Sequence, residues 1–227
     1  MKKLSEIVQN TEELIQMVDS LMKNAVDEND IEQIKSIHKS KLDNNFYLGI
    51  LHWRLNINPQ KYLNEVVSLS HKLGFYTSSI EKDKGSHDNP SNEQSLYAAY
   101  LLNITHPPLS LKDLDYTLAR AFFGNVLIGA ADIADWPKYR DALPRVRRTE
   151  LARRTNELYA DLLAGRMAPD VGVKLGEKFW EERENNEWFL DGGEGGGDEN
   201  HRLVDYQLGA ILKKIGSTVP TVHAWVW

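Results

Sequence analysis

The stretch 111–133, LKDLDYTLARAFFGNVLIGAADI, decides the fold class, because a helix over it would be apolar on nearly every side. Ser110 precedes it as an N-cap, and Asp113 lies in its first turn. A helix without a polar face must be covered by other elements. A bilayer would penalise four of its residues, Asp115, Arg120, Asn125 and Asp132. We therefore predict a buried central helix that runs to about Ile133 in a protein without membrane spans.

Amphipathic helices are predicted on both sides of this stretch. The first has an apolar repeat of about 3.5 residues, broken only at Thr11: Leu4, Ile7, Leu14, Val18, Leu21 and Ala25. A narrow stripe of this kind suits packing on a neighbouring helix, or a homodimer through the first helix. Further helices are predicted from apolar spacing and from Asn, Asp, Ser, Pro and Gly at their ends. Their ranges are 31–37, 46–55, 62–73, 96–102, 149–164 and 203–215, and one more helix begins at 169.

The fold class is therefore predicted as all-α, with eight or nine helices around the buried central helix. We expect one domain over residues 1–227, with polar loops at 76–90 and 191–200; an array of helical hairpins is the alternative. The 76–90 loop is expected to follow Gly74, read as the C-terminal cap of the 62–73 helix, and to precede a capping box at Ser91 and Gln94.

The composition changes near 107–112. Residues 1–112 hold eleven Lys, eleven Asn, three Ala and one Arg, whereas residues 113–227 hold five Lys, five Asn, twelve Ala and ten Arg. Recombination between two sources would produce such a seam. Chance variation in composition, together with a different choice between Lys and Arg on exposed helices, would also produce it. Because helices of both halves are expected to cover the central helix, we do not predict a folding boundary there.

The charge and the cysteine content exclude several classes. The net charge of −6 divides into −2 before the seam and −4 after it, which favours a basic protein partner over nucleic acid. The chain has no Cys, so disulfides and thiolate chemistry are excluded. The N-terminus, MKKLSEIVQN, lacks an apolar signal core, and we expect a cytoplasmic protein that does not bind membranes.

The Gly-rich loop DGGEGGGDEN at 191–200 is the most distinctive local feature. Its five Gly residues free the backbone, and its carboxylates come from Asp191, Glu194, Asp198 and Glu199. Three interpretations stay open: a solvated connection, an acidic element that docks a basic partner, and a cation site. The order of acidic residues is not that of an EF-hand, and no P-loop Lys is present.

No other group of residues in the sequence matches a catalytic or metal-binding pattern. The basic run at Arg145, Arg147, Arg148, Arg153 and Arg154 is expected to pair locally, with Glu150 facing both Arg153 and Arg154. The seven His form no zinc-ligand spacing, and His52 is expected to be half-buried. No Ser lies in a nucleophile motif, and no carboxylate pair stands apart from the surface. We therefore expect a protein that is not an enzyme, with no catalytic residue, metal or cofactor.

The tryptophan-bearing helices, the acidic loop and the C-terminal stretch HRLVDYQLGAILKKIG (201–216), followed by VHAWVW (222–227), together resemble one class of protein. They are similar to the small, acidic, all-helical immunity proteins of bacterial polymorphic-toxin and contact-dependent inhibition systems. This resemblance implies a cytosolic protein that neutralises a cognate, often basic, toxin by covering its active site. The partner-binding residues would be Trp188, Asp191, Glu194, Asp198, Glu199, His201, Trp225 and Trp227.

Two alternatives come from other classes. A helical scaffold or regulator would bind a peptide or protein in a groove lined by residues of the first half, such as Tyr47, Trp53 and Tyr62. A metal-dependent enzyme would assemble its ligands only in the folded state, and stoichiometric bound cation would reveal it.

Overall fold

The computed structural model describes residues 4–27, 30–54, 57–80, 92–109, 111, 118–142, 150–184 and 205–218. Within these ranges all regular structure is helical, with nine α-helices and one 3-10 helix, which confirms the predicted all-α class. By its internal contacts the chain divides into two compact units, Met1–Thr105 and His106–Trp227. This division lies beside the compositional seam, and the organisation into a single domain stays a prediction.

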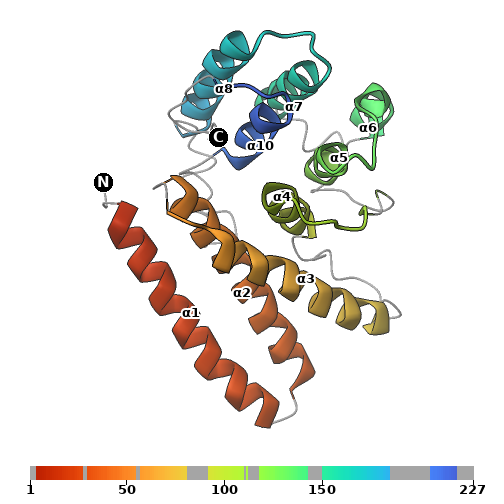
Figure 1. Cartoon of the computed structure of the whole chain (residues 1–227). Coiled ribbons are helices and arrows are strands. Elements are labelled where there is room, and N and C mark those ends of the chain that lie inside the picture. The colour runs from red at the N-terminus through yellow and green to blue at the C-terminus, as the bar shows by residue number, and fades with distance from the viewer. Residues whose placement is uncertain are drawn as a thin grey trace. The chain divides into compact units, whose positions relative to one another are not determined.

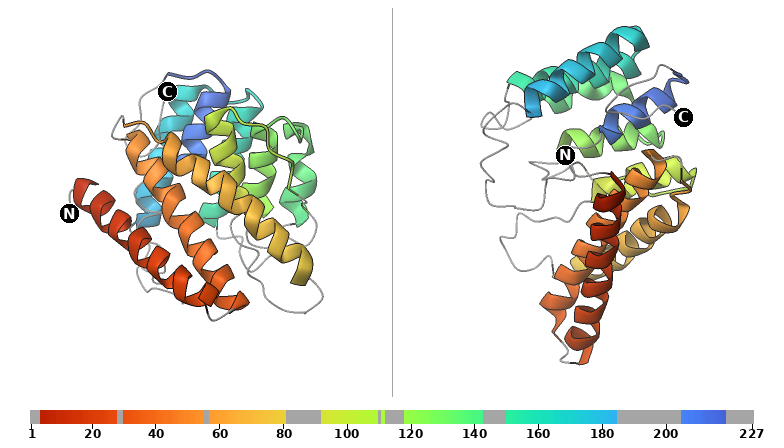
Figure 2. Two further views of the ribbon diagram at one scale, coloured as in Figure 1. Left: turned by 60° about the horizontal axis from the view of Figure 1, so that its bottom comes forward. Right: turned by 90° about the vertical axis from the view of Figure 1, so that its left-hand side faces the viewer.

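The first unit contains α1 (Leu4–Asp27), α2 (Ile31–Arg54), α3 (Gln60–Ile80) and α4 (Asn92–Leu102). Helix α2 packs along both α1 and α3, and α4 packs on α3 (Figures 1 and 2). The core of the first unit is made largely by α2, α3 and α4. Their most deeply buried large side chains are Leu42, Phe46, Leu48, Leu51, Leu63, Leu69, Leu96 and Tyr97.

The helix boundaries of this unit depart from the sequence prediction at two places. Asp30 does cap α2, because its Oδ1 accepts the backbone N–H of Gln33 at 2.9 Å. However, the two predicted segments 31–37 and 46–55 lie in one continuous helix, α2. Between them Leu42 is buried, and the buried Asn44 and Asn45 donate to the carbonyls of Ser40 and Lys41 in the preceding turn. Gly74 does not end α3, which includes residues 76–80 of the predicted loop; a glycine inside a helix costs only about 1 kcal/mol. Ser91 of the predicted capping box lies outside the described residues.

The second unit contains α5 (Leu118–Leu127), the 3-10 helix η1 (Ile133–Asp135), α6 (Trp136–Ala142), α7 (Glu150–Leu163), α8 (Pro169–Glu184) and α10 (Tyr206–Lys214). Helix α10 contacts α5, α7 and α8, so it lies at the centre of the part of this unit that can be described. Pro169 begins α8 as predicted, and Gly165 and Gly216 follow α7 and α10 with φ of 68° each. Helix α10 begins at Tyr206, three residues later than predicted.

Helix α5 is the described part of the predicted central helix, and it is buried as expected. Eight of its ten residues are buried. It ends at Leu127 and not at Ile133, because Gly129 adopts a left-handed φ of 79° and Lys214 Nζ donates to the Leu127 carbonyl at 3.0 Å. Buried Asn125 binds the backbone of Leu109 twice, accepting its N–H at 3.0 Å and donating to its carbonyl at 2.9 Å. These two bonds hold an irregular segment against α5.

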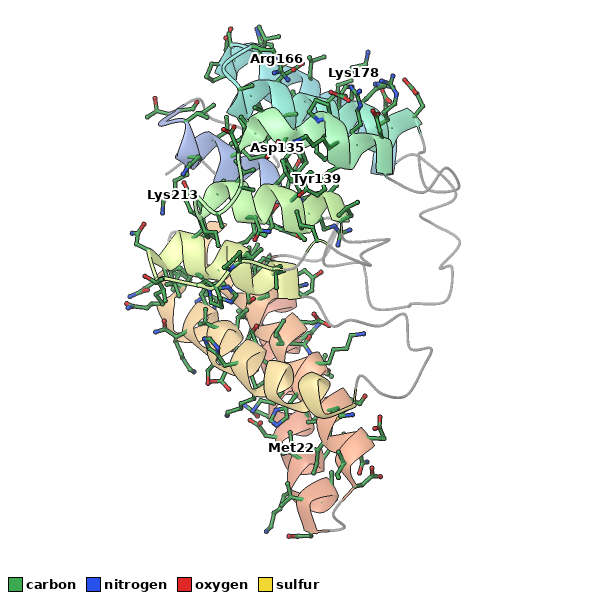
Figure 3. The ribbon with its side chains drawn as sticks, turned by 90° about the vertical axis from the view of Figure 1, so that its right-hand side faces the viewer. Met22, Asp135, Tyr139, Arg166, Lys178 and Lys213 are labelled. Carbon is green, nitrogen blue, oxygen red and sulfur yellow. The ribbon has the colours of Figure 1, made fainter. Side chains whose placement is uncertain are left out.

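Aromatic side chains join α5, α6 and α7. The Phe123 ring lies 4.8 Å from Trp136 and 5.8 Å from Tyr159, centroid to centroid. Phe122 lies 4.8 Å from Tyr139, which Figure 3 labels. Offset and edge-on aromatic pairs of this kind add about 0.5–1.5 kcal/mol each beyond the area that they bury.

Candidate functional site

The partner-binding residues predicted from the sequence lie outside the described residues. They are Trp188, Asp191, Glu194, Asp198, Glu199, His201, Trp225 and Trp227. Their role as a binding site therefore stays a prediction. The side chains of Trp53 and Trp180 are likewise outside the described part, and so are Arg145, Arg147 and Arg148.

Helix α1 presents the clearest surface feature of the first unit, an exposed apolar stripe. Leu14, Met17 and Leu21 are 39%, 55% and 41% exposed. They are spaced by three and four residues, so they lie on one side of the helix. Single exposed apolar residues are ordinary on protein surfaces, but three in one row are typical of a surface that contacts another molecule. We call these three residues the α1 stripe.

The same helix holds most of the net charge of the chain. Residues 4–27 contain five acidic residues (Glu6, Glu12, Glu13, Asp19 and Asp27) and one basic residue (Lys23), so α1 carries a net charge of −4. The whole chain carries −6, which leaves −2 for the other 203 residues. An apolar stripe on a strongly acidic helix is complementary to a partner that is both apolar and cationic.

A different face of α1 fixes the helix to its unit. Val18 and Ala25 are buried with Ile37 of α2, and Met22, which Figure 3 labels, packs against them together with Ile34. Lys41 of α2 forms an ion pair with Asp19 at 2.6 Å. Thr11 is also buried, at 4% exposed, although the sequence interpretation treated it as a break in the repeat. The α1 stripe is therefore held on a packed helix.

The predicted apolar face of the first helix needs a correction. The 3.5-residue repeat placed Leu14, Val18, Leu21 and Ala25 on one face, but only Val18 and Ala25 of these four are buried. The sequence contains two adjacent apolar rows, and α2 covers the row of Thr11, Val18 and Ala25. The spacing of Leu14, Met17 and Leu21 is visible in the sequence, but which row a neighbour covers depends on where α2 packs.

A carboxylate, a phenol and an imidazole from three helices meet where α1 approaches α2 and α3. The Tyr62 hydroxyl donates to Glu12 Oε1 at 2.5 Å, and Glu12 Oε1 lies 4.0 Å from His52 Nε2. The His52 and Tyr62 rings are edge-on, with centroids 4.7 Å apart, and Lys61 Nζ lies 5.0 Å from the Tyr62 centroid. Tyr47 and Tyr62, two of the residues considered for a scaffold groove, are only 6% and 8% exposed.

Burial shifts the pKa of both ionisable rings of this cluster. Burial and the hydrogen bond to Glu12 raise the pKa of Tyr62 to about 12. Burial lowers the pKa of His52, against the opposing effect of Glu12, and both of its ring nitrogens are buried without a hydrogen-bond partner. The phenol is therefore protonated at neutral pH, and its hydrogen bond to Glu12 joins α1 to α3.

We expect the folded protein to lose stability on mild acidification. Burial lowers the pKa of both His38 and His52 below 6.5, and Lys72 and Lys41 lower the pKa of His38 further. The unfolded chain then binds more protons than the folded chain, so stability is full above the unfolded pKa and decreases as the pH falls through 6.5. Thermal unfolding followed by circular dichroism should show a lower melting temperature at about pH 5.5 than at about pH 7.5.

The control for this expectation is a double variant, His38→Gln with His52→Gln. Its melting temperature should change less than that of the wild-type chain over the same pH range. An unchanged pH dependence in the double variant would assign the effect to other groups.

The second unit contains paired ionisable groups with structural roles. The Tyr159 hydroxyl donates to both oxygens of Asp205, at 2.9 and 2.8 Å. Arg154 forms two hydrogen bonds to Glu182 of α8, each 3.0 Å long, and lies 4.3 Å from the Phe179 ring centroid. Glu150 forms the predicted ion pair with Arg153 at 2.7 Å, and it interacts with Arg154 through charge while the direct ion pair of Arg154 is with Glu182. Burial lowers the pKa of Lys213 on α10, which Figure 3 labels.

Neither unit shows a metal centre in its described part: no three His, Asp or Glu side chains there are grouped to hold an ion. Comparisons of the chain with protein-family models, with curated proteins and with solved structures found no match.

Hydropathy gives one further finding. Among the helices that the structure describes, none is both long and apolar enough to cross a lipid bilayer.

Proposed function

We propose that this chain is an immunity protein, which binds a basic bacterial toxin domain and neutralises it by covering its active site. The observation that carries the proposal is helix α1, where an exposed apolar stripe lies on a helix with a net charge of −4. A protein that acts by occlusion needs an apolar contact surface and a field that attracts its partner. Long-range attraction between opposite net charges also speeds the encounter.

Neutralisation is tested by protection. The first step is a search of the neighbouring genes for a secreted protein with a variable C-terminal domain, and that domain is then produced in cells with and without the chain. We expect the domain alone to arrest growth, growth to continue when the chain is also produced, and a stable complex when the two purified proteins are mixed. Growth arrest in the presence of well-folded chain would contradict the proposal.

The acidic loop predicted from the sequence is a second, separate candidate for contact with the toxin domain. Reversal of its four charges, by Asp191→Lys, Glu194→Lys, Asp198→Lys and Glu199→Lys, removes the attraction to a basic partner. We expect the affinity for the toxin domain to fall about tenfold or more at low salt, with a weaker dependence on ionic strength. Unchanged affinity and unchanged salt dependence, measured by titration calorimetry, would remove the loop from the binding site.

A helical regulator that binds a partner without neutralising it is the second candidate function. The same α1 stripe favours it, because apolar contact and acidic charge suit any basic partner. The two functions differ in the growth experiment: a regulator binds its partner but gives no protection against a toxin domain.

A further inference from the structure

We propose that the α1 stripe receives an amphipathic basic helix of the partner, which pairs lengthwise with α1. This inference rests on the proposed function, because it names the partner's contacting element. Its first support is the geometry of the stripe. Leu14, Met17 and Leu21 follow the three-and-four spacing by which two helices interlock side chains. A partner helix that lies along α1 would contact all three side chains at once.

The ends of the stripe limit the length of the contact. Asn10 and Asn24 continue the same spacing on either side, and both are exposed. The apolar part is therefore bounded by amides, and it spans the eight residues from Leu14 to Leu21, or about 10 Å along the helix axis. A partner helix of two to three turns would match it with about three apolar side chains.

The border of the stripe determines the charge of the partner. Glu13, Ser20 and Asp27 recur every seven residues beside the stripe, and all three are exposed. Positions of this kind flank the seam of a helix pair and select partners by charge. Two of the three are carboxylates, so Lys or Arg at the facing positions of the partner would be attracted.

A second copy of this chain is a poorer occupant of the stripe. Self-pairing would bring the carboxylates Glu13 and Asp27 of two copies to the borders of one contact, and like charges across an interface are unfavourable. A basic helix would meet the same stripe with opposite charge. Met17 at the centre of the stripe also suits a partner of different sequence, because its flexible thioether side chain adapts to different neighbouring side chains.

The contact area predicts a modest affinity for the helix alone. A pairing over two to three turns buries less than the roughly 1,200 Å² of a standard stable interface. The isolated partner helix should therefore bind weakly, and the rest of a toxin domain would supply the remaining affinity.

The probe is a synthetic helical peptide of about 21 residues, with Leu at the seam positions and Lys at the flanking ones. Its affinity for the full chain is measured by fluorescence anisotropy at low and high salt. Two comparison peptides are used: one with the same composition in scrambled order, and one with Glu in place of Lys. We expect binding of the basic amphipathic peptide at least tenfold tighter than that of either comparison peptide, and weaker binding at high salt.

Variants of the chain locate the binding. The triple variant Leu14→Ser, Met17→Ser, Leu21→Ser should lose at least tenfold in peptide affinity, and Glu13→Lys with Asp27→Lys should lose several-fold and most of the salt dependence. The matched control is Ile57→Ser with Val171→Ser, which removes side chains 49% and 46% exposed elsewhere. The control should bind normally, and circular dichroism checks that every variant keeps its helix content and melting temperature. If the triple variant is unstable, Glu13→Lys with Asp27→Lys still tests the proposal, because it leaves the apolar side chains unchanged.

The outcomes separate this inference from the proposed function. If the chain neutralises a toxin domain and the α1 variants neutralise it equally well, the inference is overturned and the function stands. If the peptide binds through α1 and no toxin domain is neutralised, the inference stands and the function fails. If sedimentation equilibrium shows a dimer that the triple Ser variant converts to a monomer, a second copy occupies the stripe and the inference is overturned.

Discussion

Replacement of Asp205 by Ala is expected to destabilise the second unit by roughly 3–4 kcal/mol, because one carboxylate satisfies two parts of the structure. Asp205 Oδ1 accepts the backbone N–H of Leu208 at 2.9 Å and thereby caps α10. Both carboxylate oxygens also accept the Tyr159 hydroxyl, whose side chain is 1% exposed. Since α10 contacts α5, α7 and α8, an unfavourable start of this helix affects the whole unit.

The measurement is thermal and urea unfolding of the purified full-length chain, in which we expect the melting temperature to fall by roughly 10 °C. Asp132→Ala is the matched control. Asp132 also caps a helix, with its Oδ1 2.9 Å from Ala134 N, but it is exposed and caps only a three-residue 3-10 helix. The control should cost about 1 kcal/mol or less. Tyr159→Phe should fall between the two, because it keeps the cap. Equal losses for Asp205→Ala and Asp132→Ala would contradict the double role.

The local features of this fold were predictable from the sequence because they depend on neighbouring residues. Asp30 before α2, Pro169 at the start of α8 and Gly165 after α7 act within one helical turn. The contact between Tyr159 and Asp205 joins residues 46 positions apart, and the sequence interpretation placed Asp205 inside the last helix. A cap is recognisable only when the helix start is known, and here the start depends on packing against α5, α7 and α8.

The candidate site was predictable only in part, for a similar reason. Apolar spacing identified the first helix, but it did not reveal which of two adjacent apolar rows α2 would cover. The concentration of negative charge in residues 4–27 can be counted directly. It was overlooked because the charge was totalled over the two halves of the chain, which placed −4 of the net charge after the seam. The acidic loop was predicted from composition and stays a prediction.

A bulky substitution at Gly49 should cause a large loss of stability in the first unit. A Cβ atom at this position would lie 2.5 Å from Leu63 Cδ2 and 2.8 Å from Leu63 Cγ, both shorter than van der Waals contact. Leu63 is fully buried, at 0% exposed, so any movement of its side chain takes place within the core. The missing side chain of Gly49 therefore allows α2 and α3 to approach closely. We expect Gly49→Val to destabilise the unit by roughly 3 kcal/mol.

Gly49→Ala separates this packing effect from helix propensity. Alanine is favoured over glycine inside a helix by about 1 kcal/mol, whereas forcing one methyl group into a filled core costs about 1–3 kcal/mol. A net loss of stability in urea unfolding would show that the close approach outweighs propensity, and a net gain would show that α2 and α3 separate without cost. Ser36→Val, at an exposed position of the same helix, is the control for the β-branched side chain.

A double-mutant cycle identifies the atoms responsible. Leu63→Ala alone should cost about 2–5 kcal/mol, because it leaves a cavity in the core. In the presence of Gly49→Val that cavity is partly filled by the new side chain, so the double variant should lose less stability than the sum of the single variants. We expect this coupling to be about 1–2 kcal/mol in favour of the double variant. Strict additivity would mean that the cost at Gly49 arises somewhere other than its contact with Leu63.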